Sequence, residues 1–470
     1  MPQKKPNIVL IFSDQHRHDA MGCAGNPDIQ TPNLDWLASQ GTRYDTVWCQ
    51  APFCQPSRAS FITGYYPQQL GFQDLSSVNN PPTLMKKLQA MGYETATIGK
   101  MHYTEIANLQ KLAASQSINT ADFNDHFKQY GWNYLVQEFD KYHHVTPGVT
   151  TPYLSYLESQ GLKKAYQQQV KQYMRGTPNH WRAATLPFAQ KHDLTTFLTD
   201  HALSWLTDRE SEKAFFLKIG YVQPHPPLIA DPEWAAIYAN KDIHLPNFER
   251  IKATVPIWKA YIDKLEKHAQ LSNMKKIHIT AAIKQYYAAI SLIDQQIGRL
   301  LDQLRSTGEI DNTIIIYTAD HGEMMGEKRL WGKMNFYKGS VQVPLIVKNC
   351  AGSSGQAQVI KKPLELLDLH EAIVTTANSN ETSTNFNQLL SRKAQTKTHS
   401  VSQHGEFTSI LLDGIRYTEH TPSKTACELF DITNDRSELT NLATLKAYKK
   451  RVKEGSKSLQ KAIEILPKIN

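Results

Sequence analysis

Two pairs of polar side chains that could bind a divalent cation follow two short apolar runs that lie far apart in the chain. Asp14-Gln15 follow the run 7–12, and Asp320-His321 follow the run 313–317. Carboxylate oxygens, an amide oxygen and an imidazole can together hold such an ion. An aspartate at a strand end is often only a helix or turn cap, so either pair alone leaves that alternative open.

A cysteine lies within the run Cys54-Gln55-Pro56-Ser57-Arg58. Most buried cysteines act only as small apolar residues. A thiol of that kind requires neither a proline two residues later nor an arginine four residues later. The spacing, together with the two polar pairs, therefore marks Cys54 and Arg58 as candidates for chemistry and favours a metal site over simple caps.

Four further side chains could supply positive charge or move protons. Lys100 and His102 follow one apolar run, His225 is held between prolines after another, and Lys333 ends the segment Leu330-Trp-Gly-Lys333. Flanking prolines fix the backbone around His225. A single lysine is usually solvated and a single histidine usually structural. We expect chemistry from Lys100, His102 and His225 because they share an edge with the metal pairs.

The elements that position these residues are short apolar runs, which alternate with helical patterns. Strands buried on both faces read as near-continuous Val, Ile, Leu and Phe, and their alternation with helices predicts an α/β layered sheet. Ligands of such sheets bind outside the carboxyl ends of the strands. Helices are expected from Thr31-Pro32 to near Gly41 and over 283–304. The expected strands are 7–12, 94–98, 214–221, 313–317 and 343–347.

The rest of the chain divides by composition. Residues 103–200 are rich in Tyr, His, Gln and Trp and are expected to be an insertion bordering the site, while the polar segment 376–398 resembles a linker. Short alternating runs and a basic helical stretch follow, which predict a small antiparallel sheet with one helix. We therefore expect a catalytic α/β domain over 1–380 and a small α+β subdomain over 381–470.

Composition excludes several classes of protein. The 470 residues are 40% hydrophobic and 20% charged, with a net charge of +8 from scattered lysines and arginines. No nucleic-acid motif and no apolar stretch of membrane-spanning length is present, so neither partner is expected. Five cysteines without a CxxC pair indicate no disulfide framework. The chain as written carries no signal-peptide pattern and is expected to be cytoplasmic, although a trimmed signal would leave no trace.

The ordered motifs resemble those of the type I sulfatases of the alkaline phosphatase superfamily. The resemblance spans nearly the whole chain, and the C-x-P-S-R spacing is the family's maturation signal. It implies a large mixed, mostly parallel sheet flanked by helices, with a small C-terminal antiparallel sheet plus helix. The segments that carry it are 6–15, 54–64, 92–102, 320–323, 330–333 and 428–443.

This resemblance implies that a formylglycine-generating maturation enzyme oxidises Cys54 and that the aldehyde hydrate attacks a sulfate ester. One hydroxyl would displace the alcohol, and the other would drive release of sulfate. Arg58 would orient the hydrate. Lys100 and Lys333 would bind sulfate oxygens. His225 is the candidate acid for the leaving oxygen.

His102 is the candidate that assists collapse of the sulfated hemiacetal, and Asp14, Gln15, Asp320 and His321 would hold one cation together with residue 54. Many sulfatases have Asp-Asp and Asp-Asn at these pairs, and the Gln and His variants resemble choline sulfatases and phosphonate monoester hydrolases. Ca²⁺ is the first expectation, with Mn²⁺ or Zn²⁺ as alternatives.

The predicted function is hydrolysis of a sulfate monoester on a carbohydrate or another small organic molecule. A phosphonate or phosphate ester hydrolase with the same apparatus remains an alternative, as does a non-catalytic anion- or glycan-binding relative. The aromatic residues of 103–200 could stack on a sugar ring, or they could pack a core or the interface of a homo-oligomer.

Overall fold

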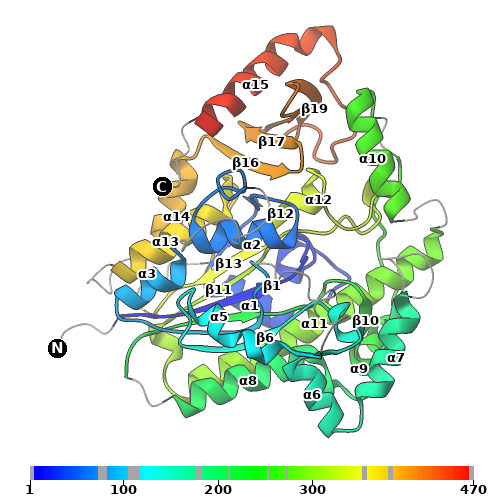
Figure 1. The fold of residues 1–470 in the computed structure, drawn as a ribbon. Coiled ribbons are helices and arrows are strands. Elements are labelled where there is room, and N and C mark those ends of the chain that lie inside the picture. The colour runs from blue at the N-terminus through cyan, green and yellow to red at the C-terminus, as the bar shows by residue number, and fades with distance from the viewer. Residues whose placement is uncertain are drawn as a thin grey trace.

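A large sheet with helices on both faces forms the centre of the computed structural model (Figure 1). The residues that it describes are 5–71, 82–103, 117–174, 183–209, 212–250, 253–269, 274–351, 357–378 and 385–464. In order across the sheet, its eight strands are β14 (Gln358–Ile360), β2 (Thr42–Tyr44), β13 (Leu345–Lys348), β11 (Thr313–Ala319), β1 (Asn7–Ser13), β9 (Phe215–Gly220), β4 (Glu94–Lys100) and β6 (Tyr134–Glu138).

The sheet is mixed and mostly parallel, which confirms the predicted fold class. Strand β1 pairs in parallel with β11 and β9, and β4 pairs in parallel with β9 and β6, whereas β13 runs antiparallel to both β11 and β2. Every residue of β1 is buried. Ile8, Leu10 and Phe12 belong to one core, while Val9 and Ile11 belong to the core on the opposite face. Burial on both faces explains the near-continuous apolar run.

Helices cover both faces of the sheet. The first face packs against α2 (Cys54–Thr63), α3 (Leu84–Ala90), α13 (Leu366–Asn378) and α14 (Phe386–Thr396). The second face packs against α1 (Pro32–Ser39), α8 (Leu194–Asp208) and the C-terminal half of α11 (Lys276–Ser306). Helix α11 begins earlier than the predicted 283, because Ile279 and Ala282 extend its buried stripe. None of the described helices has the length and apolar character needed to span a bilayer.

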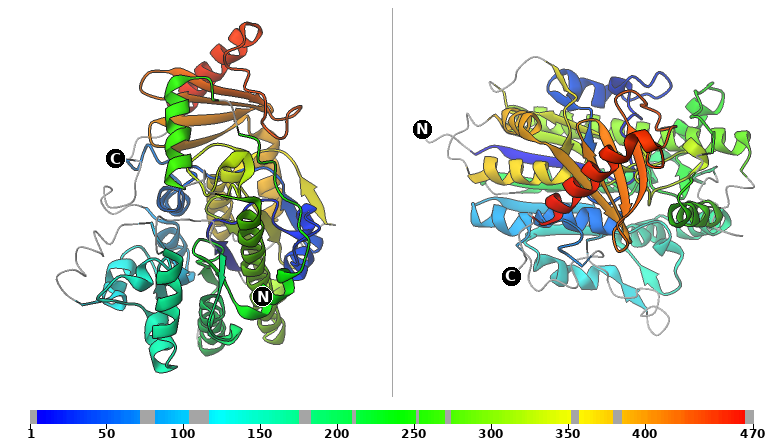
Figure 2. Two further views of the ribbon diagram at one scale, coloured as in Figure 1. Left: turned by 90° about the vertical axis from the view of Figure 1, so that its right-hand side faces the viewer. Right: turned by 90° about the horizontal axis from the view of Figure 1, so that it is seen from above.

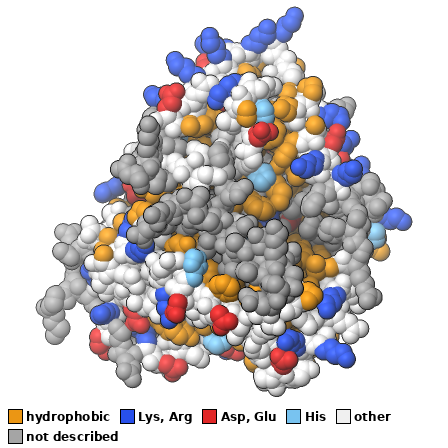
Figure 3. Space-filling view, in the orientation of Figure 1, with side chains coloured by type: hydrophobic (Ala, Val, Ile, Leu, Met, Phe, Trp, Pro, Cys, Tyr) orange, Lys and Arg blue, Asp and Glu red, His pale blue; other side chains and the backbone are white. Residues whose placement is uncertain are grey.

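A second, antiparallel sheet lies at one end of the molecule (Figure 2). Helix α15 (Lys449–Glu464) packs on it through Leu459 and Ala462, and lysines and arginines gather over this helix in Figure 3. The predicted small sheet with one helix is therefore confirmed. The domain boundary at residue 380 falls outside the described residues and stays a prediction. The sheet consists of β16 (His399–His404), β17 (Phe407–Leu412), β18 (Ile415–His420) and β19 (Thr425–Asp431).

Two expectations about the C-terminal half were wrong. The single strand 343–347 is two strands, since β12 (Gln342–Val343) pairs with β3 (Val47–Trp48) and the chain joins the main sheet only at Leu345. Pro344, which has no N–H to donate, separates them. The expected linker over 376–398 contains helix α14, because Phe386, Leu390 and Ala394 form a buried stripe at helical spacing.

Part of the aromatic-rich segment 103–200 belongs to the main sheet, because β6 is its edge strand. Residues 104–116 and 175–182 of this segment lie outside the described residues. Many of its aromatic rings pack in the interior, as Trp132 and Tyr153 do. Its other elements are β5 (Ile118–Asn119), α5 (Asn124–Lys128), β7 (Val149–Thr150), α6 (Pro152–Ser159), α7 (Lys163–Met174) and β8 (Ala183–Thr185).

The remaining elements include the strands that complete two small sheets. Strand β10 pairs with β8, β15 completes the small sheet of β12 and β3, and α9 packs against α11. These elements are β10 (Leu228–Ala230), α9 (Pro232–Ala239), α10 (Pro256–His268), α12 (Lys338–Val341) and β15 (Leu364–Glu365).

Candidate active site

The two polar pairs meet at the carboxyl edge of the main sheet. Ser13 and Ala319 are register partners in the parallel strands β1 and β11, so Asp14 and Asp320 leave the sheet side by side. One donor atom each from Asp14, Cys54, Asp320 and His321 lies within 4.8 Å of the others, and all four residues are buried. The sequence prediction that these pairs share one location is thus matched by the geometry.

The donor set fits a divalent cation. The Nδ1 of His321 lies 3.0 Å from the Gly322 carbonyl oxygen, an arrangement that leaves Nε2 free to act as a ligand. The backbone N–H groups of Gln15 and His321 donate to Asp320 Oδ1 at 3.0 and 2.9 Å, which fixes that carboxylate. The Oε1 of Gln15 is buried and has no hydrogen-bond partner among the described residues. A buried amide oxygen without a donor is suited to a cation.

Gln15 adopts a constrained backbone conformation beside these ligands. Its φ is 66°, a left-handed value that is uncommon outside glycine, and His102 at φ 46° shares this feature. The side-chain amide of Gln15 donates to Glu323, which fixes which end of the amide faces the cluster. Such strain persists only where surrounding contacts determine it, and it concentrates at functional sites.

Cys54 is the first residue of α2, and Arg58 lies one turn further along the same helix. The helix begins with unpaired N–H groups and a positive dipole end, which favour a negative group at residue 54. Arg58 Nε donates to Asp320 Oδ2 at 2.7 Å, and a terminal nitrogen donates to Asp14 Oδ2 at 3.1 Å. Arg58 therefore pairs with both carboxylates of the cluster and offsets part of their charge.

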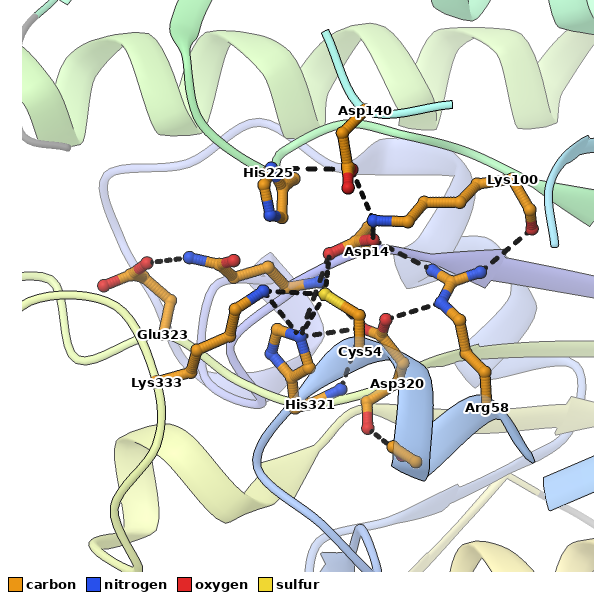
Figure 4. Close-up of polar contacts among 12 residues, drawn as sticks. Asp14, Cys54, Arg58, Lys100, Asp140, His225, Asp320, His321, Glu323 and Lys333 are labelled. Carbon is orange, nitrogen blue, oxygen red and sulfur yellow. Dashed lines mark hydrogen bonds and ion pairs between the residues drawn. The ribbon is translucent and has the colours of Figure 1, made fainter. Parts of the chain in front are cut away.

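Positive side chains surround the sulfur of Cys54 (Figure 4). Lys333 Nζ lies 2.7 Å from Sγ, and His321 Nε2 lies 3.2 Å from it. Burial by itself would raise the pKa of Cys54, but Lys100, Lys333 and His321 outweigh it and hold the pKa well below its usual value. An anionic nucleophile at this position is therefore stabilised.

Lys100 lies at the end of β4 between two carboxylates. Its ammonium forms ion pairs with Asp14 and Asp140. Arg58 and Lys218 both donate to the Lys100 carbonyl oxygen, each at 2.9 Å. These contacts hold the end of β4 against the cation cluster.

Two histidines complete the site on the side opposite α2. His225 lies in the loop after β9, where Nδ1 is 2.6 Å from the Pro226 carbonyl oxygen and 3.8 Å from Asp140 Oδ1. His102 contributes to the low pKa of Cys54 through a hydrogen bond. The Nδ1 of His102 has no hydrogen-bond partner in the described part of the chain. The structure thus brings together all ten side chains singled out from the sequence.

These groups open into a cleft of about 240 Å³. Its polar wall contains Gln15, Cys54, His102, His225 and Lys333. Its outer wall is largely apolar and aromatic, with α10 supplying part of it. The residues of that outer wall include Phe53, Tyr142, Leu265, Ala269, Trp331 and Met334.

Sequence reasoning missed two acidic residues of the site. Asp140 pairs with Lys100, and Glu323 accepts from the Gln15 amide. Asp140 comes two residues after β6, so the same rule that found Asp14 would have found it had β6 been recognised as a strand of the main sheet. Glu323 stands two residues after His321, within a segment already singled out.

A set of cation ligands, fixed positive side chains and two imidazoles around one nucleophile position defines a hydrolase of anionic esters. The Sulfatase family model matches residues 6–379, so the chain belongs to the sulfatase family and is a sulfatase enzyme.

Similar proteins agree with this assignment. An arylsulfatase of Clostridium perfringens is 28% identical over 484 residues, covering 98% of this chain and 95% of the relative. A choline-sulfatase of Rhizobium meliloti is 27% identical, covering 74% of this chain and 63% of its own length. The phosphonate monoester hydrolase of Agrobacterium radiobacter has the same fold, with a TM-score of 0.76 at 20% identity and 98% and 96% of the two chains covered.

Proposed function

We propose that this sulfatase cleaves the sulfate monoester of a small organic alcohol or saccharide with residue 54 as the nucleophile. The proposal requires that a maturation enzyme oxidise Cys54 to formylglycine, so that the sulfur marks the position of the hydrate oxygens. The observation that supports it most is the contact of Lys333 with Cys54 Sγ at 2.7 Å, beside the cation ligands. A formylglycine hydrate there supplies an oxygen nucleophile and a second hydroxyl for the release of sulfate.

The positive side chains of the site suit a sulfate group. Arg58 pairs with Asp14 and Asp320, and Lys100 pairs with Asp14 and Asp140. Lys333 lies beside the Cys54 sulfur. The fixed charges of these residues nearly balance, so a bound divalent cation makes the pocket net positive. Lys333 and Lys100 would bind the sulfate oxygens, and their attraction grows as charge develops in the transition state.

The proposed cation is Ca²⁺, held by Asp14, Gln15, Asp320, His321 and residue 54. When bound there, it supplies a Lewis acid that polarises the ester and lowers the pKa of a coordinated hydroxyl. Three of these residues offer oxygen ligands, which favours Ca²⁺, while the imidazole makes Mn²⁺ or Zn²⁺ alternatives.

The two histidines divide the proton transfers. His225 lines the cleft and would give a proton to the leaving oxygen. His102 hydrogen-bonds to residue 54 and would take the proton from its second hydroxyl, so that sulfate is released. General acid–base help of this kind contributes about 10²–10⁴-fold.

The test compares 4-nitrophenyl sulfate with a phenylphosphonate monoester, using protein produced together with a maturation enzyme. We expect a higher kcat/KM for the sulfate and no turnover of either ester by Cys54→Ala. A strong preference for the phosphonate would contradict the proposal and support the phosphonate hydrolase alternative.

A further inference from the structure

Asp140 places a carboxylate where an anionic substrate must bind, and the mechanism above does not use it. Its side chain is 12% exposed and lines the cleft with Cys54 and His225. Burial by itself would raise the pKa of Asp140, but Lys100, His225 and His102 outweigh it and hold the pKa well below its usual value. A buried negative charge beside an anion site is costly unless its partners require it.

The partners of Asp140 are the groups that act on the substrate. Oδ1 pairs with Lys100 Nζ and lies 3.8 Å from His225 Nδ1. Figure 4 shows the Asp140 carboxylate joined by dashed lines to the His225 ring and to the end of Lys100. One carboxylate oxygen thus faces both a sulfate-binding cation and the candidate acid.

His225 lines the cleft, and its two ring nitrogens have different surroundings. Nδ1 is occupied by the Pro226 carbonyl oxygen at 2.6 Å. Nε2 lies on the other end of the ring, away from Asp140 (Figure 4). A carboxylate beside Nδ1 attracts the positively charged imidazolium, which is the form that can give up a proton.

We propose that Asp140 is a positioning residue that orients His225 for protonation of the leaving oxygen, while Lys100 balances the charge of its carboxylate. This inference rests on the proposed function. As the ester S–O bond breaks, its electron pair stays with the leaving oxygen, which takes the proton from His225 Nε2. The hydrate oxygen of residue 54, which is deprotonated before the attack, forms the new bond to sulfur. Neutral His225 keeps the proton on Nδ1, where it is hydrogen-bonded to the Pro226 carbonyl oxygen.

The experiment measures kcat for Asp140→Asn across a series of sulfates that runs from 4-nitrophenyl through phenyl to alkyl leaving groups. A good leaving group requires little protonation and a poor one requires much. We expect a loss of about 10-fold with 4-nitrophenyl sulfate and of about 10³-fold with phenyl or alkyl sulfates. In a His225→Ala background, Asp140→Asn should add little further loss for the poor leaving groups.

A merely structural role would lower kcat by one common factor for every leaving group, and that result overturns the inference. Asp140→Glu keeps the charge at a longer reach and should show an intermediate dependence on the leaving group. If Asp140→Asn does not fold, Asp140→Glu allows the same comparison of kcat across the leaving groups.

A wild-type enzyme that turns over phosphonates but not sulfates would overturn the proposed function alone, since the leaving-group series can be repeated with phosphonate esters. Inactivity towards both would overturn the function and the inference together.

Discussion

The ammonium of Lys333 lies 2.7 Å from the sulfur of Cys54, although 279 residues separate them in the chain. Lys333 comes from the loop after β11 and Cys54 from the start of α2, so only the fold makes them neighbours. Lys333 is half-buried, and a cation there that contacts the nucleophile position stabilises negative charge more than a fully solvated cation would.

Lys333→Ala should therefore reduce kcat strongly. We expect a loss of about 10²–10³-fold with little change in thermal stability, because the lost attraction is greatest in the transition state. Steady-state kinetics with 4-nitrophenyl sulfate measure the effect. The control is Lys276→Ala at the exposed start of α11, which should retain full activity. Equal rates for Lys333→Ala and the wild type would exclude a role for this lysine.

Calcium should stabilise the folded protein as well as activate it. A ligand at about 100 times its Kd adds about 2.7 kcal/mol to the free energy of unfolding. We expect the Tm in EDTA to rise on addition of CaCl₂, with activity restored in parallel. Gln15→Asn keeps a residue that tolerates positive φ but withdraws the amide oxygen, so it should reduce the Tm shift. A wild-type Tm that does not change on addition of calcium would contradict the proposed site.

Stability should fall at acidic pH partly because of His370. Its Nδ1 lies 2.6 Å from the Phe61 carbonyl oxygen, and burial, helped by Lys87, lowers its pKa from 6.5 to about 3. Because the folded-state pKa is the lower one, the unfolded state binds the proton first. The contribution of His370 is complete above pH 6.5 and declines as the pH falls towards 3.

Protonation of His370 alone should lower the free energy of unfolding by about 2 kcal/mol between pH 6.5 and about pH 5, since each pKa unit corresponds to about 1.4 kcal/mol. Urea unfolding in EDTA at pH about 7.5 and about 5 measures the loss for the wild type and for His370→Gln. The free energy of unfolding of His370→Gln should fall less on acidification than that of the wild type. An identical fall in both proteins would show that another group is responsible.

Arg416 should be essential for stability. It donates to Glu428 at 2.8 Å and to Glu438 at 2.6 Å, and all three side chains are buried. Arg416→Met leaves two buried carboxylates without their cation and should cost about 3–5 kcal/mol in the free energy of unfolding. The matched control Arg451→Met removes a side chain that is 63% exposed and should change little. An Arg416→Met variant with the wild-type free energy of unfolding would refute this account of the C-terminal sheet.

The sequence was sufficient to predict that the candidate cation ligands lie together, because parallel strands deliver their C-terminal residues to one edge. Asp14 and Asp320 follow strands with clear apolar runs, so their common location could be inferred. Lys100 and His225 were found by the same rule at β4 and β9.

Asp140 could not be found in this way, since β6 is a short edge strand without a long apolar run and lies in a segment without clear periodicity. The contacts among the site residues also depend on side-chain packing. The pairing of Lys100 with both Asp14 and Asp140, for example, joins residues that follow two different strands, β1 and β6, and no spacing in the chain predicts it.

The most direct test of the central claim is a peptide mass spectrum that covers residue 54, recorded on protein produced with and without a formylglycine-generating enzyme. The account predicts an aldehyde in place of the Cys54 thiol, and sulfatase activity in proportion to the modified fraction. Fully active protein with an unmodified thiol at Cys54 would contradict it.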